Sequence, residues 1–317
     1  MTRSGFFARG RSLAVLMRSL FFTTIIFLPA VFLSEEITAI AKEGLMLSFG
    51  TVIPSVFPFI ILTDFAVRYI HFESVARLRR LFERIFKING CGLSAFISGI
   101  LGGFPLGAHR SIELYKSGKI SKDECERLIG FANNASPGYI ICAVGGGLLG
   151  SVKVGILLYF ITILSSVISG AVMGIKKDFS EERAEIAEQK YSFVASVKSA
   201  AAICISIAAF ITAFTILGGV IGLMVKAPSM KILLLPIFEI GSAAAYISKS
   251  GAFSRLCAIT AISFSISFSG LSVYAQTASL TEGSGISMMR YVITKLICGL
   301  ISAATAFLFF LLVDFFF

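Results

Sequence analysis

Two short segments of the chain combine residues that break helices with strongly apolar surroundings. They are residues 102–108 (Gly-Gly-Phe-Pro-Leu-Gly-Ala) and residues 131–138 (Phe-Ala-Asn-Asn-Ala-Ser-Pro-Gly). In a membrane, a backbone N–H or C=O that leaves its helix costs several kcal/mol unless a polar group meets it. Irregular backbone therefore persists at membrane depth only where it lines a cavity or is buried in protein. Both segments are candidate ligand sites if the chain spans a membrane.

The second segment offers polar side chains. The amide and hydroxyl groups of Asn133, Asn134 and Ser136 supply both donors and acceptors, which suit a carboxylate or a ring nitrogen of a solute. The alternative is structural, because Asn and Ser are also preferred as caps at a helix end. We favour substrate binding, because these side chains lie within an apolar run.

The first segment offers backbone groups at Gly103, Phe104, Pro105 and Gly107. Bare backbone at such glycines can present N–H groups and the positive end of a helix to an anion. The alternative is close helix packing through small residues. The sequence leaves both possibilities open.

Four ionisable residues are further candidates. His109 and Arg110 follow the first segment directly and could recruit a dianion, or they could form a solvated flank that sets the topology. Glu239 lies inside an apolar run, and carboxylates at membrane depth commonly serve as proton or cation sites. Asp64 is similar but lies near the expected cytoplasmic end of its span. We assign Glu239 and Asp64 to coupling.

The composition places the chain in a membrane. Of 317 residues, 56% are hydrophobic and 15% are charged, and the mean hydropathy is +0.89. Soluble domains have about 45–50% apolar and about 25% charged residues. Apolar runs near the ~20 residues that cross a bilayer recur at roughly 19–34, 45–67, 92–108, 139–175, 200–225, 232–248, 256–280 and 291–317. We expect an all-α, polytopic integral membrane protein with seven to nine membrane segments, some of them interrupted or re-entrant.

The net charge of +10 does not indicate nucleic-acid binding, because the basic residues flank the apolar runs. This bias places the N-terminus and residues 68–90 and 176–199 in the cytoplasm. Residues 109–127 would lie outside if 92–108 crosses fully, and inside if 92–108 enters and returns as a half-helix or hairpin. We prefer the returning arrangement. Residues 68–89 also carry apolar side chains at helical spacing opposite arginines, which indicates an interfacial amphipathic helix.

The expected organisation has a linker between two membrane halves. Residues 1–44 form an N-terminal signal-anchor helix and a short external loop, 45–175 the first half, 176–199 a cytoplasmic linker and 200–317 the second half. Residues 103–108 can be laid over 270–275 without a gap, which suggests an inverted repeat of the kind found in transporters. The second half would then add Ser272, Tyr274 and Gln276 to the site.

Motifs for catalysis are missing from the sequence. It has two histidines and no H-E-x-x-H, P-loop or G-x-S-x-G pattern. Its six cysteines are scattered without metal-ligand spacing. We therefore expect no enzyme activity, no cofactor and no metal. The expected partners are the lipid bilayer and a small solute, with a homo-oligomer left open.

Four motifs in order carry a family resemblance: residues 52–60, 98–108, 131–137 and 270–279. Together they resemble the sporulation integral membrane protein YlbJ family, part of the wider group with nucleoside-recognition, or Gate, domains, over roughly residues 45–300. The resemblance implies a multi-pass inner-membrane protein of endospore-forming bacteria, in the mother-cell or outer forespore membrane, with dipicolinate export towards the spore. The chain is short for the family, and Ala-His109-Arg110 replaces the expected Ala-Lys.

Three functions follow. The first is a transporter or facilitator of a small organic anion, with dipicolinate as the candidate. The second is a transporter of nucleosides or similar neutral heterocycles. The third is a scaffold for spore maturation that transports nothing.

Overall fold

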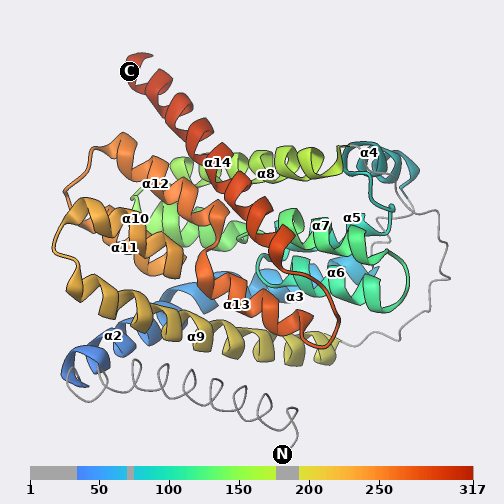
Figure 1. Ribbon diagram of the computed structural model, residues 1–317, viewed down its shortest axis with the longest axis horizontal. Coiled ribbons are helices and arrows are strands. Elements are labelled where there is room, and N and C mark those ends of the chain that lie inside the picture. Colours follow the sequence, from blue (N-terminus) through green and yellow to red (C-terminus); the bar gives the residue numbers. More distant parts are fainter. Residues whose placement is uncertain (1–33, 70–74, 176–192, 317) are drawn as a thin grey trace, which may run out of the picture.

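The computed structural model describes residues 34–69, 75–175 and 193–316 (Figure 1). Within these ranges every regular element is a helix and there is no strand, which confirms the all-α fold class. The expected signal-anchor helix before Ser34 and residues 176–192 of the expected linker lie outside the described residues.

The first half contains α2(Ser34–Leu47), the π-helical turn η1(Ser48–Val52), α3(Ile53–Tyr69), α4(Ala76–Phe86), α5(Gly92–Gly102), α6(Leu106–Lys116), α7(Lys122–Ala132), the π-helix η3(Gly138–Leu148) and α8(Val152–Gly174). The second half contains α9(Phe193–Met224), α10(Pro228–Phe238), α11(Ile240–Lys249), α12(Arg255–Phe268), α13(Gly270–Thr281) and α14(Met289–Phe316). Both halves therefore mix long helices with short ones.

Within the described residues, five helical stretches are long and apolar enough to cross a membrane. They are Ser34–Val67, Val152–Gly174, Phe193–Met224, Arg255–Thr281 and Met289–Leu312. The shorter apolar helices are Gly92–Gly102, Gly138–Leu148 and Pro228–Phe238. This mixture of long and short apolar helices confirms a polytopic membrane protein with interrupted segments.

The helices α5 and α6 pack against each other as a hairpin whose turn is residues 103–105. Two basic clusters consequently lie at the same end of the molecule. The Arg127 guanidinium, from the 109–127 cluster, donates hydrogen bonds to Phe86 O (2.8 Å) and Lys87 O (2.7 Å), in the 68–90 cluster. The sequence allowed residues 92–108 either to cross fully or to enter and return. In the structure they enter and return.

The amphipathic segment forms α4, which packs on the protein through its aromatic residues. Phe82 and Phe86 are buried, and the Phe86 ring stacks on Phe131 with 4.6 Å between centroids. Arg80 and Arg84 are exposed on the other side of the helix. The helix thus joins the end of the hairpin to α7 and α8.

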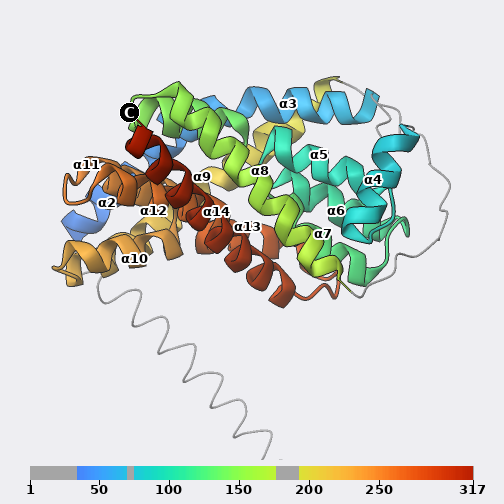
Figure 2. The ribbon, with the colours of Figure 1, turned by 90° about the horizontal axis from the view of Figure 1, so that it is seen from above.

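The same order of elements occurs in both halves. A hairpin (α5–α6 or α10–α11) is followed by an interrupted helix (α7–η3 or α12–α13) and then by a long helix (α8 or α14). Figures 1 and 2 show the α5–α6 hairpin at one side of the molecule and the α10–α11 hairpin at the other. This order of elements is typical of a repeat, and the inverted orientation of its halves stays a prediction.

The alignment of residues 103–108 with 270–275 must be corrected. Residues 103–105 are the turn of a hairpin, whereas Ser269 and Gly270 interrupt an extended apolar helix, each with a positive φ. By position in the fold, the first hairpin turn corresponds to Phe238-Glu239-Ile240-Gly241 of the second.

Three other segments differ from the sequence expectation. Residues 35–44, expected as a loop, are helical and run through η1 into α3, since they are rich in the helix formers Glu, Ala and Lys. Residues 193–199, expected in the linker, begin α9. The run 232–248, expected as one span, is divided at Glu239, because the backbone of this residue is extended (φ −150°, ψ 133°) and its side chain caps α11.

One close contact fixes the first hairpin to the first interrupted helix. The Ala132 carbonyl oxygen, at the end of α7, lies between Gly99 and Gly107 of the hairpin, and a Cβ on either glycine would overlap with it. The two glycines therefore allow close helix packing at this point. Close packing was one of the two alternatives for Gly107 in the sequence.

This contact predicts the effect of Gly99→Ala. We expect the free energy of unfolding to fall by at least about 1–3 kcal/mol, because the added methyl group must push the Ala132 backbone away. The measurement is thermal unfolding of the purified protein in detergent. Gly222→Ala in α9 is the matched control, since its Cβ would approach a Leu235 methyl group no closer than 3.9 Å. Equal stability of Gly99→Ala and Gly222→Ala would contradict the contact.

Candidate functional site

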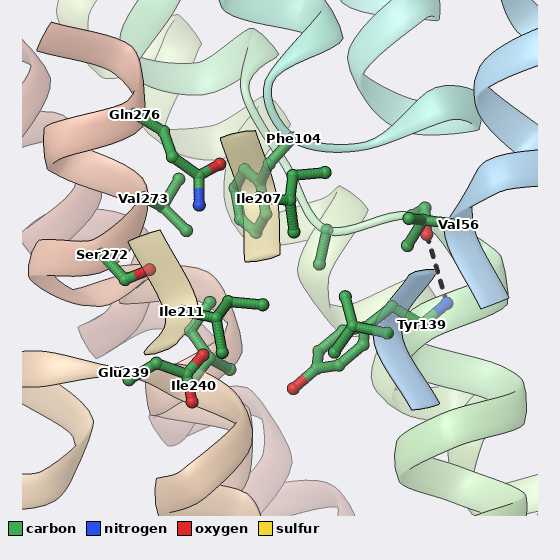
Figure 3. Close-up of a pocket in the computed structure, with 13 residues that line it drawn as sticks. Val56, Phe104, Tyr139, Ile207, Ile211, Glu239, Ile240, Ser272, Val273 and Gln276 are labelled. Atoms are coloured by element: carbon green, nitrogen blue, oxygen red, sulfur yellow. Dashed lines mark hydrogen bonds between the residues drawn. The ribbon is translucent and has the colours of Figure 1, made fainter. Parts of the chain in front are cut away.

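Three helix interruptions contribute residues to one cavity (Figure 3), and a fourth lies just before α13, which also lines it. They lie at residues 103–105, 133–136, Glu239 and Ser269. The cavity volume is about 50 Å³, which is room for on the order of three waters at about 15 Å³ each. A ring-sized solute needs more space than this conformation offers.

The cavity is mostly apolar and draws on both halves. The hairpin turns contribute Phe104 and Glu239, and the long helices contribute Val52, Val56, Ile207 and Ile211. Val52 belongs to η1, whose π-helical turn precedes Pro54. Pro54 lacks the N–H that would continue a regular α-helix, so proline accounts for the irregular turn beside the cavity.

The polar groups of the cavity come mainly from the interrupted helices. Ser136 Oγ accepts a hydrogen bond from Tyr139 N (3.2 Å) at the start of η3. Ser272 Oγ and Gln276 Oε1, from α13, are buried and have no hydrogen-bond partner. Figure 3 shows these two side chains on one side of the cavity and Tyr139 on the other. Buried polar atoms are normally paired, so Ser272 and Gln276 are suited to receive a polar ligand.

Glu239 is the acidic side chain that lines the cavity. Its side chain caps α11, since Oε2 accepts a hydrogen bond from Ser242 N at 2.6 Å. The residue is 4% exposed. A carboxylate is stabilised at a helix N-terminus by the helix dipole as well as by this bond. The predicted acidic residue at membrane depth is therefore part of a hairpin turn.

Asn133 and Asn134 do not line the cavity. They belong to a buried group of five residues that we call the break cluster: Asn133, Asn134, Ser166, Thr277 and Lys295. Asn133 Nδ2 donates to Thr277 Oγ1 (2.9 Å), and Asn134 Oδ1 accepts from Ser166 Oγ (2.7 Å). The Lys295 ammonium donates to Asn133 O and, at 3.4 Å, to Asn134 Oδ1. The amides thus hold the interruption of α7 in place.

A second, smaller pocket contains the other charged candidates. Asp64, His109 and Arg110 line it with Glu113, outside the central cavity. Arg110 Nη1 lies 3.0 Å from Glu113 Oε2, and Ser196 Oγ donates to Asp64 Oδ2. The structure therefore separates these residues from Glu239.

The remaining candidates have packing positions. Gly103 has φ +81° and abuts Ser136, while Pro105 precedes α6. The Tyr274 ring packs 6.1 Å from the Tyr291 ring and is not among the residues that line the cavity.

Lys295 is the buried residue that the sequence analysis missed. It is 1% exposed and lies inside α14. A signal was available, because a lysine within an apolar span is rare and usually functional. The partners of Lys295 could not be predicted from the sequence, because they lie more than 100 residues away in the chain.

The fold and the site define the class of protein: an all-α, multi-pass membrane protein in which interrupted helices of two halves surround a central cavity. Over 306 aligned residues the chain is 26% identical to the sporulation integral membrane protein YlbJ of Bacillus subtilis (strain 168). The alignment covers 83% of this chain and 75% of that protein. This similarity supports the YlbJ family and a location in a bacterial membrane.

No family model matches the chain, and no solved structure matches it. Within the described residues, no group of three or more His, Cys, Asp and Glu side chains could hold a metal ion. The Gate-domain relationship and the absence of a cofactor stay predictions.

The cap at Glu239 predicts different stabilities for two variants. Glu239→Ala removes the acceptor for Ser242 N, so the free energy of unfolding should fall by about 0.5–2 kcal/mol. Glu239→Gln keeps an oxygen acceptor and should remain close to the parent protein. Thermal unfolding in detergent measures both. Equal losses would show that the charge, and not the cap, stabilises the turn.

Proposed function

We propose that this protein is a secondary transporter or facilitator of a small organic solute. The observation that carries the proposal is the convergence of helix interruptions from two halves on one cavity. Transporters with repeated halves place their substrate sites where interrupted helices meet near the bilayer midplane. A scaffold protein has no need for such a cavity.

The ends of the short helices supply the binding chemistry. The N-terminal turns of η3, α11 and α13 border the cavity through Tyr139, Ile240 and Ser272. In transporters of this kind, N-termini of half-helices face anionic groups of the substrate. Because the present cavity has room for only a few waters, binding of a solute requires the elements of the two halves that line it to move apart.

Dipicolinate is the specific substrate that we propose, with export from the mother cell towards the developing spore as the role. The similarity to a sporulation integral membrane protein supports the setting. A pyridine dicarboxylate would use the helix N-termini for its carboxylates and the apolar lining for its ring. Proton or cation uptake at Glu239 would offset the repulsion between that carboxylate and an anion.

A nucleoside or another neutral heterocycle is the second candidate. Ser272 Oγ and Gln276 Oε1 are unpaired in an otherwise apolar cavity, a combination that suits a flat ring with polar edges. The Glu239 carboxylate would accept a hydrogen bond from such a ring without charge repulsion.

Uptake by liposomes that contain the purified protein tests these candidates. We expect uptake of labelled dipicolinate that unlabelled dipicolinate, but not uridine, reduces. Glu239→Gln should insert normally and lose or uncouple uptake. Preferential uptake of uridine would favour the nucleoside function, and no uptake of either would favour a scaffold. Disruption of the gene in a sporulating host should lower the dipicolinate content of spores.

Two variants distinguish the central cavity from the second pocket. Gln276→Leu removes a polar group from the cavity, and the loss of a hydrogen bond to a charged ligand costs about 1.5–3 kcal/mol. Dipicolinate binding should therefore weaken about ten- to hundredfold at any salt concentration. The control is Arg110→Gln, which should have a smaller effect that shrinks at high salt because the arginine is partly solvated. The reverse order would place the binding site in the second pocket.

A further inference from the structure

The Lys295 ammonium lies at the C-terminal end of an interrupted helix. The helix α7 ends at Ala132, and Lys295 Nζ donates to the carbonyl oxygen of the next residue, Asn133. A second acceptor, Asn134 Oδ1, lies at 3.4 Å. Cations are stabilised at helix C-termini, where the last carbonyl groups lack partners. The ammonium therefore occupies a position built for a cation.

The surroundings of the ammonium contain oxygens and aromatic rings rather than carboxylates. Within the described part of the chain, Lys295 forms no ion pair with Asp or Glu at salt-bridge distance. Its Nζ lies 5.5 Å from the centroid of the Phe104 ring and 6.0 Å from that of Tyr291. Asn133 Oδ1, in the same cluster, is buried without a hydrogen-bond partner. Neutral oxygens from two consecutive residues are thus available to a monovalent cation.

Interrupted helices in ion-coupled transporters use this position for an exchangeable ion. There, unwound carbonyl groups and the C-terminal ends of half-helices coordinate Na⁺ or H⁺. In this chain a lysine from α14 reaches the corresponding place from a sequence distance of 162 residues. A lysine ammonium has three donors and a compact charge, so it can satisfy the same oxygens as a bound ion.

We propose that the Lys295 ammonium is a tethered cation that fills the ion position of the break cluster, so that the protein works without an exchangeable Na⁺ at this position. This inference deepens the proposed transport function and rests on it. The ammonium also lies directly behind Phe104, which lines the cavity. Movement of the first hairpin turn would therefore change the contacts of the ammonium, although no ion enters or leaves.

The first test compares salts on the unaltered protein. The midpoint of thermal unfolding in detergent is measured in NaCl, LiCl, KCl and choline chloride at equal ionic strength. A ligand that binds the folded state raises the midpoint by mass action. We expect the same midpoint in all four salts, because the position is already filled. A rise of about 2 °C or more in NaCl over choline chloride, abolished by Asn134→Ala, would overturn the proposal.

The second test empties the position. Lys295→Ala should have a lower midpoint in choline chloride and should recover about 2–4 °C in a small monovalent cation, which can now bind to the vacant oxygens. Lys153→Ala, at the exposed start of α8, is the matched control and should respond to no cation. A folded Lys295→Ala protein without any cation response would overturn the proposal.

Lys295→Met keeps the test valid if the alanine variant does not fold. The methionine side chain is unbranched, like that of lysine, and lacks the charge. We expect a lower unfolding midpoint in every salt and at least a tenfold loss of solute uptake. Parent-like stability together with parent-like uptake would show that the ammonium is unnecessary. The salt series needs no transported solute, so failure of the proposed transport function and failure of the tethered cation are read separately.

Discussion

The structure depends on one constraint, which is that backbone groups freed by a helix interruption inside a membrane need partners within the protein. At the end of α7, the Asn133 carbonyl receives the Lys295 ammonium, and the Ala132 carbonyl lies between two glycines. At the start of α11, the Ser242 N–H is bound by Glu239. A regular helix would not need these partners, because it pairs its own backbone groups. The interruptions create this requirement, and the buried charges and the close glycine contacts meet it.

Two of the buried charged residues, Glu239 and Lys295, serve different interruptions. Glu239 is negative and stabilises the N-terminus of a half-helix, whereas Lys295 is positive and stabilises a C-terminus. Both are matched to the dipole of the helix end that they contact. Glu239 lines the cavity directly, and Lys295 is screened from it by the Phe104 ring. A solute in the cavity would therefore meet the acidic group first and the basic group only through the aromatic ring.

Local patterns in the sequence predicted the interruptions near residues 102–108 and 131–138, but not the one at Glu239, and they did not show which side chains face the cavity. Gly and Pro at residues 102–108 and 131–138 act on their own backbone, so the breaks could be read directly. Asn133 and Asn134 were assigned to substrate, and in this structure they contact Lys295, Ser166 and Thr277, because their orientation is set by helices far away in the chain. Lys295 was missed for the same reason. Ser272, Gln276 and Glu239 were found because polar groups within apolar runs are conspicuous in any orientation.

The contact of Ala132 with Gly99 and Gly107 determines which parts of the molecule can move independently. The carbonyl oxygen fits between the two glycines without spare room, so the first hairpin cannot slide along α7. In the second half, Gly270 similarly abuts the carbonyl oxygens of residues 236–238, at the end of α10. Each hairpin is thereby locked to the interrupted helix of its own half. In the proposed transport cycle, a hairpin and its broken helix would therefore move together, and access to the cavity would open between two such units.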